Sequence, residues 1–160
     1  METLSITGCT ADELRGVMRR WMTGIAIVTS AGPNGRPVGL VSNSFTSVSL
    51  DPPLVSWCAD RRSTSIGIWS TTDAFSVHVL AEGDAHLVPR FATRGSDKFA
   101  GLAPGQSLVG APALPFEGAR LDCRLWARYD GGDHLILVGQ VAAISGAEDF
   151  DPLTVQHLGN

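Results

Sequence analysis

Three short polar segments carry the residue types that could do chemistry. The first is Ser42-Asn43-Ser44, which interrupts the otherwise strand-like run from Gly39 to Leu54. Small polar residues in a strand leave backbone N–H and C=O groups accessible, so a flat heteroaromatic ring with donors and acceptors on its edge could lie against them. Taken alone, the same residues could simply end a strand, with their hydroxyls capping turns.

The second segment is Ala59-Asp60-Arg61-Arg62-Ser63-Thr64-Ser65. Two arginines beside three hydroxyls suit a phosphate, because a guanidinium fork and O–H donors both satisfy phosphate oxygens. The segment also leads into an expected short helix, whose N-terminus would favour an anion. The alternative is a solvated loop that ends in a helix cap.

The third segment is Asp130-Gly131-Gly132-Asp133-His134. A glycine turn here would present the histidine at the start of a strand. The alternative is a tight hairpin whose histidine is merely exposed.

Familiar catalytic and metal-binding motifs are absent. The sequence has no G-x-G-x-x-G, Walker A, G-x-S-x-G or H-E-x-x-H pattern. Its four histidines lack metal-ligand spacing, so no metal is expected. Its three cysteines are odd in number and widely spaced, which argues against a disulfide framework and favours the reducing cytoplasm. We expect Cys58 and Cys123 to be buried small hydrophobes.

Composition limits the possible partners. The 160 residues predict one domain, 1–160, with Met1–Cys9 as a tail. The net charge of -4 excludes a fold-wide basic surface for nucleic acid. We find no signal peptide and no apolar stretch long enough to span a bilayer, so no membrane partner is expected.

Residue patterns predict the helices, strands and hairpins that position these three polar segments. Thr10 and Glu13 form a capping box, and apolar residues at helical spacing then predict an amphipathic helix from Ala11 to Met22. Two further helices are expected, a short one around Ile66–Trp69, into which the polar loop that begins at Arg61 leads, and one over 82–92. Turn residues at Asn34-Gly35 and Gly131-Gly132 predict hairpins. The predicted strands cover 25–30, 38–50, 54–59, 74–80, 121–128 and 134–144, and 100–118 is expected to be loop.

Six or seven closely spaced strands without βαβ alternation predict an antiparallel sheet closed into a barrel, with one or two helices packed outside. The run Leu135-Ile136-Leu137-Val138 lacks alternation, which predicts burial on both faces. Contact with a second subunit is one way to supply the second face.

Six segments together resemble the short-chain flavin reductases, the reductase components of two-component flavin-dependent monooxygenases. In order they are TGIAIVTS (23–30), SNSFTSVSLDPPLV (42–55), FSVHVL (75–80), RFATRGSDKFAG (90–101), LDC (121–123) and GDHLILVGQV (132–141). The resemblance runs from about Val17 to Ile144. It implies the mainly β, antiparallel Greek-key type FMN-binding split barrel. It also implies a homodimer that reduces FMN or FAD with NADH, or sometimes NADPH, and supplies reduced flavin to a partner monooxygenase.

The same resemblance implies a set of site residues. His134 would border the nicotinamide and is the one catalytic residue expected. The residues expected to bind flavin are Ser42, Asn43, Ser44, Phe45, Cys58, Ala59, Arg62, Ser63, Thr64, Ser65, Phe91, Lys98 and Phe99. The chain departs from the family pattern at Arg61-Arg62, which is less basic in many relatives, and at 151–160, which lacks the aromatic residues common there.

Three rival interpretations remain open from the sequence. One is a flavin-binding module without reductase activity, such as a carrier or sensor. Another is a split barrel that uses a different cofactor, such as haem, pyridoxal phosphate or deazaflavin. Composition alone would also allow a purely structural dimeric barrel.

Overall fold

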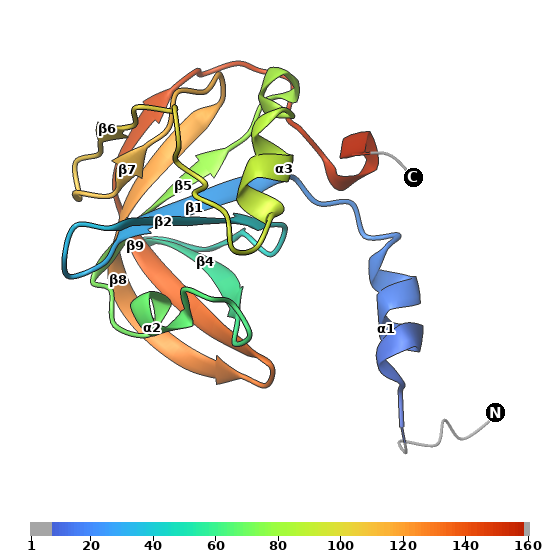
Figure 1. Cartoon of the computed structure of the whole chain (residues 1–160). Helices are drawn as coiled ribbons and strands as arrows, with labels where there is room; N and C mark the ends of the chain where they lie inside the picture. Colours follow the sequence, from blue (N-terminus) through green and yellow to red (C-terminus); the bar gives the residue numbers. More distant parts are fainter. Residues whose placement is uncertain (1–7, 159–160) are drawn as a thin grey trace.

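The computed structural model describes residues 8–158, and its centre is one antiparallel sheet coiled into a split barrel (Figure 1). Its seven strands lie in the order β2-β1-β5-β8-β9-β4-β3, and the antiparallel sheet of six or seven strands that the sequence predicted is confirmed. Most of the predicted tail, residues 1–7, lies outside the described residues. The strands are β1 (Ala26–Ala31), β2 (Pro37–Ser42), β3 (Thr46–Leu50), β4 (Pro53–Asp60), β5 (Ala74–Val79), β8 (Ala119–Gly131) and β9 (His134–Gly146).

Two apolar clusters form the core. Inside the barrel, Trp57 meets Trp69 and Phe75 edge-on, with ring centroids 4.8 and 5.9 Å apart. The second cluster lies beneath α3 and includes Leu87 and Phe91. Edge-to-face aromatic pairs of this kind add about 0.5–1.5 kcal/mol each beyond the burial of their area. They hold β4 and β5 rigidly behind the polar segments.

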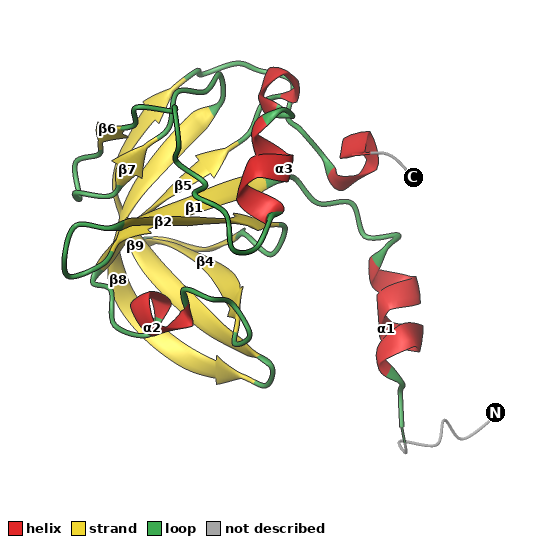
Figure 2. Cartoon of the chain, viewed as in Figure 1, coloured by secondary structure: helices red, strands yellow, loops and turns green. Residues whose placement is uncertain are grey.

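Helices are few and lie outside the sheet (Figure 2). They are α1 (Ala11–Met18), α2 (Ile66–Trp69) and α3 (Leu87–Ala92), with 3-10 turns at Glu82–Asp84 and Val155–Leu158. α3 packs on β2, as expected of a helix outside a barrel. No described helix is long and apolar enough to cross a membrane.

The N-terminal helix departs from prediction in length and in packing. Its capping box is present, because the Thr10 hydroxyl accepts from the Glu13 N–H and the Glu13 carboxylate accepts from the Thr10 N–H. It ends at Met18 instead of Met22, and none of its residues is buried. It stands clear of the barrel in Figure 1. Helices this short gain most of their stability from packing, so an apolar face without a partner supports only two turns.

The predicted strand 38–50 is two strands, which is a correction that matters for the site. β2 ends at Ser42, and β3 begins at Thr46 on the far edge of the sheet order. Between them the Ser44 N–H donates to the Ser42 hydroxyl at 3.3 Å. A local bond of this kind replaces a strand ladder and lets the chain turn from one edge toward the other.

The predicted helix 82–92 is also divided. Its first part is a 3-10 turn and only its second part is α-helix. The buried Asp84 carboxylate explains the break, because it accepts from the N–H groups of Ala81, Glu117 and Gly118 at 2.8, 2.8 and 3.2 Å. These bonds anchor the turn to a distant loop. That loop, expected to lack structure, also contains the two-residue strands β6 (Gly105–Gln106) and β7 (Pro112–Ala113).

The two glycine hairpins form where predicted. Gly35 and Gly132 have φ values of 70° and 73°, a left-handed conformation that glycine adopts without a Cβ clash. The second hairpin joins the 13-residue strands β8 and β9. The β9 run expected to be buried on both faces is buried at Leu135, Leu137 and Val138, whereas Ile136 is half-buried. β9 also pairs with β4, which sets His134 opposite Asp60.

Candidate active site

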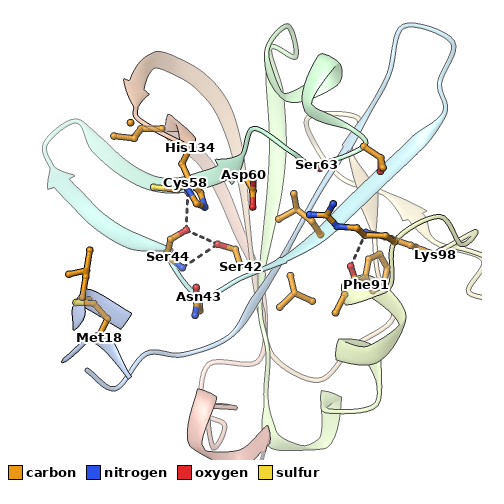
Figure 3. Close-up of a pocket in the computed structure, with 18 residues that line it drawn as sticks. Met18, Ser42, Asn43, Ser44, Cys58, Asp60, Ser63, Phe91, Lys98 and His134 are labelled. Carbon is orange, nitrogen blue, oxygen red and sulfur yellow. Dashed lines mark hydrogen bonds between the residues drawn. The ribbon is translucent and has the colours of Figure 1, made fainter. Parts of the chain in front are cut away.

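The three polar segments meet around one cavity of about 790 Å³. Figure 3 shows that Ser44, Cys58 and His134 lie on one side of it and that Ser63 and Lys98 lie on the other. Its size is in the range of small-molecule and cofactor sites. The predicted site residues that line it are Ser42, Asn43, Ser44, Cys58, Ser63, Thr64, Phe91, Lys98 and His134.

One wall is a chain of hydrogen bonds between β2 and β4. The Ser44 hydroxyl accepts from the Cys58 N–H at 2.9 Å and lies 2.9 Å from the Ser42 hydroxyl (Figure 3). Asn43 sits between the two serines, and its side chain is exposed and forms no hydrogen bond within residues 8–158. Its amide therefore offers both donors and an acceptor to a ligand in the cavity.

The opposite end holds a fixed cation. The Lys98 ammonium donates to the carbonyl oxygens of Phe91 at 2.8 Å and Gly39 at 3.1 Å. An ammonium has three N–H donors, so one remains for a ligand. Burial and the nearby Arg94 guanidinium lower the pKa of Lys98. A Cβ on Gly39 would lie 2.8 Å from the Phe91 ring, so glycine lets this cradle close.

Two hydroxyls lie beside this cation in the loop after β4. Ser63 accepts from the Ser65 N–H at 3.3 Å, and Ser65 in turn accepts from the Trp69 indole at 3.1 Å. These bonds fix the loop against α2. Thr64 is exposed, and its hydroxyl forms no hydrogen bond with the described residues, so it is open to a ligand.

His134 borders the cavity from the β8–β9 hairpin. Its Nδ1 lies 2.7 Å from the Asp133 carboxylate, a contact that lowers the pKa of Asp133. Its Nε2 has no hydrogen-bond partner in the described part of the chain. The ring is therefore oriented from one nitrogen and leaves the other for a ligand.

The two adjacent arginines are occupied by carboxylates. Arg61 donates to the Asp130 carboxylate at 2.6 Å and to the Gly132 carbonyl at 2.9 Å, which ties the loop to the hairpin. Arg62 donates to Asp60 at 2.9 and 3.2 Å, and these bonds hold the pKa of Asp60 well below its usual range. Arg62 does not line the cavity. The predicted role of Arg62 in binding a phosphate is therefore not supported, because its guanidinium is already paired with the carboxylate of Asp60, two residues earlier in the chain.

Other predicted residues also lie elsewhere. Ala59 is fully buried, and Phe45 packs against the barrel core. Ser65 and Phe99 line a neighbouring cavity. Cys58 was expected to be a buried hydrophobe but is half-buried, because it lines the cavity wall. Cys123 is fully buried as expected, and burial raises the pKa of its thiol to about 12.

Sequence reasoning missed half of the cavity lining. The apolar α1 residues Leu14 and Met18 reach its mouth, a role that helical periodicity alone could not assign. Ile136 could have been found, because it lies two residues beyond His134 on the same strand face. The lining residues not predicted are Leu14, Met18, Leu40, Val41, Asp60, Ala92, Arg94, Gly131 and Ile136. No residue of 151–158 lines the cavity, and no cluster that could hold a metal ion occurs among residues 8–158.

The cavity of this split barrel combines a hydrogen-bonding wall with a cationic end, an arrangement that suits a planar ring joined to an anion. Comparison with known proteins identifies the class of protein. Residues 18–158 match the flavin reductase like domain, and the chain belongs to this family.

Three relatives illustrate the similarity. The reductase subunit HsaB of a flavin-dependent monooxygenase from Rhodococcus jostii is 38% identical over 139 residues, which cover 87% of this chain and 71% of that protein. The FMN reductase (NADH) SmoA of Agrobacterium fabrum is 38% identical over 91% of this chain and 82% of its own length. The NADH:FAD oxidoreductase of Streptomyces globisporus, solved with NAD and FAD fragments, superposes with a TM-score of 0.82 at 32% identity, covering 89% of this chain and 86% of that one.

Proposed function

We propose that this protein transfers a hydride from NADH or NADPH to a flavin and releases the reduced flavin to a partner monooxygenase. The observation that carries the proposal is the polarity of the cavity, with neutral donors and acceptors at one side and the Lys98 ammonium at the other. The names of the relatives, which include an NADH-dependent FMN reductase and a monooxygenase reductase subunit, support it.

The residues present fit a flavin. The pyrimidine edge of the flavin ring carries both donors and acceptors, which suit the Asn43 amide and the Ser42 and Ser44 hydroxyls. Its phosphate suits Lys98 together with the Ser63 and Thr64 hydroxyls, since charge-assisted bonds to phosphate are the strong ones. The bound flavin supplies the electron-accepting chemistry.

The protein's own contribution is to orient two rings. Hydride transfer needs the reacting atoms about 3–3.5 Å apart and aligned. The rigid β4 wall would hold one ring, and His134, oriented by Asp133, would hold the nicotinamide against it. The reaction needs no strong general base, so a site of neutral hydroxyls and amides is sufficient.

The proposal includes a homodimer. The apolar face of α1 is open, with its large side chains more than half exposed. Because a short helix needs a packing partner, we propose that a second copy covers it. The residues of this face are Leu14, Val17 and Met18, and the exposed Trp21 and Met22 follow directly after the helix. Light scattering on the purified protein measures this directly, and a monomeric mass at micromolar concentration would exclude it.

The cytoplasm is the proposed compartment. Cys58 and Cys123 are free thiols within the described chain, which suits a reducing environment.

The loss of NADH or NADPH absorbance tests the proposed activity, measured with no flavin and then with riboflavin, FMN or FAD. Flavin-dependent oxidation of the nicotinamide is the expected result. Flavin binding without turnover would instead support a binding module. Failure to bind any flavin would contradict the proposal and favour a split barrel that uses another cofactor, such as haem, pyridoxal phosphate or deazaflavin.

A further inference from the structure

A second cavity, of about 680 Å³, adjoins the first at its cationic end. Thr64 and Lys98 line both cavities, so the two meet where the flavin phosphate is proposed to bind. The lining of the second cavity consists of Arg36, Pro37, Val38, Gly39, Thr64, Ser65, Ile68, Gly95, Ser96, Asp97, Lys98 and Phe99.

The second cavity is lined by an arginine, Arg36, whose guanidinium is not paired with a carboxylate of the described residues. Arg36 extends from the end of the β1–β2 hairpin and is exposed. Its guanidinium forms no ion pair or hydrogen bond with residues 8–158, in contrast to Arg61 and Arg62. A guanidinium that is free and faces a cavity is suited to bind a phosphate through two parallel N–H donors.

The remaining lining suits a flat heterocycle with hydroxyl or amino donors. Val38, Ile68 and Phe99 supply half-buried apolar surface. The Asp97 carboxylate accepts from the Phe99 N–H at 3.1 Å and has further lone pairs for a ribose hydroxyl or an exocyclic amine. The carboxylate would repel a phosphate, which leaves Arg36 as the anion-binding group of this cavity.

We propose that the second cavity takes the adenylate half of FAD, so that this protein binds FAD more tightly than FMN. The inference rests on the proposed function. The first phosphate would occupy the shared boundary at Thr64 and Lys98, the second would meet Arg36, and the adenosine would lie against the apolar wall.

The position of the cavity favours FAD over the nicotinamide nucleotide as the source of this adenylate. In FAD the adenylate is joined covalently to the flavin phosphate, so it must continue from Thr64 and Lys98. The nicotinamide is proposed to lie by His134, on the other side of the first cavity from Lys98 (Figure 3).

Isothermal titration calorimetry with FMN and FAD, in the absence of nicotinamide, tests the inference on the full chain. We expect the Kd of the unmodified protein to be about tenfold lower for FAD than for FMN, as one charge-assisted hydrogen bond provides. Arg36→Ala should raise the Kd for FAD about tenfold and leave that for FMN within about twofold. Arg36→Lys should restore part of the FAD affinity.

Two further variants are needed. One fills the second cavity without removing a charge, and the other removes an arginine that lies outside both cavities. Ser96 is exposed and lines only the second cavity, so the bulky side chain of Ser96→Phe should weaken FAD and spare FMN. Arg124→Ala is the matched control, because Arg124 is also exposed and without an ion pair in the described chain but lines neither cavity. It should change neither Kd.

Each contrary outcome has a distinct meaning. Equal Kd values for FMN and FAD that Arg36→Ala leaves unchanged would overturn the inference and leave the proposed function standing. An Arg36→Ala effect on NADPH affinity with none on FAD would assign the cavity to the nicotinamide nucleotide and would also overturn it. No binding of either flavin would refute the proposed function and this inference with it.

Discussion

The Ser44 hydroxyl accepts a hydrogen bond from the Cys58 N–H at 2.9 Å, although Ser44 lies between β2 and β3 and Cys58 lies in β4, 14 positions along the chain. This bond ties the crossing between β2 and β3 to the strand that forms the cavity wall. It also orients the Ser44 side chain toward Ser42, 2.9 Å away. The geometry of the wall proposed to bind the flavin ring therefore depends on the hydrogen bond from the Cys58 N–H to the Ser44 hydroxyl.

Removal of that acceptor should affect both stability and binding. Ser44→Ala leaves the Cys58 N–H without its partner, which costs about 1–3 kcal/mol. We expect the melting temperature to fall by roughly 2–12 °C and the Kd for flavin to rise. Calorimetry and flavin titration measure the two effects. Ser47→Ala, at an exposed serine whose hydroxyl makes no hydrogen bond with residues 8–158, is the control. Unchanged flavin affinity in Ser44→Ala would contradict the role of this wall.

The Lys98 ammonium should distinguish flavins with a phosphate from riboflavin. Its free N–H donor is proposed to bind the phosphate, so Lys98→Gln should raise the Kd for FMN by about 10- to 100-fold. Riboflavin lacks the phosphate and serves as the matched ligand control, with its Kd expected to change little. An equal loss for riboflavin and FMN would mean that Lys98 acts only by holding the Phe91 and Gly39 carbonyls.

His134 should affect the nicotinamide more than the flavin. The side chain borders the cavity, and its Nε2 has no partner within the described chain. His134→Ala is expected to raise the KM for NADH or to slow flavin reduction, with a smaller change in the Kd for flavin. Steady-state kinetics and flavin titration provide the comparison. His86→Ala, at an exposed histidine outside the cavity, is the control. Unchanged NADH kinetics in His134→Ala would remove this residue from the mechanism.

Stability should fall in mild acid because of a buried histidine that does not line the cavity. His78 is fully buried, and its ring lies 3.1 Å from both the Ile27 carbonyl and the Leu114 N–H. Nε2 accepts from Leu114, so the folded ring is neutral with its proton on Nδ1. Burial lowers the pKa of His78 from 6.5 to about 4.

The sign of the pH effect follows from proton binding. Between about pH 6.5 and 4 the unfolded state binds a proton that the folded state excludes, so stability is full above this window and declines as the pH falls through it. At pH 5 the loss is about 2 kcal/mol relative to pH 7. Urea unfolding at the two pH values measures it, and His78→Gln should reduce the difference while the exposed His86→Gln should not. An unchanged difference in His78→Gln would assign the acid sensitivity to other groups.

Local chemistry made much of the fold predictable. The Thr10–Glu13 capping box and the Asn34-Gly35 and Gly131-Gly132 turns are satisfied within a few residues, so the chain needs no distant partner to form them. The alternating pattern and close spacing of the strands indicated the antiparallel barrel, although its strand pairs join residues far apart in the chain. The resemblance to flavin reductases, carried by six segments, also indicated the family.

Contacts between distant residues decided the rest. The end of α1 at Met18 reflects an apolar face that finds no partner within the described chain. The division of the predicted strand 38–50 after Ser42 depends on the hydrogen bond between Ser44 and Cys58, which are distant in the sequence. Arg61 and Arg62 looked alike in sequence, yet one pairs with Asp130 across 69 residues and the other with Asp60, while Arg36 remains free beside a cavity. Residue types along the chain determine which groups can bind a phosphate, but only the folded structure determines which of them a carboxylate has already taken.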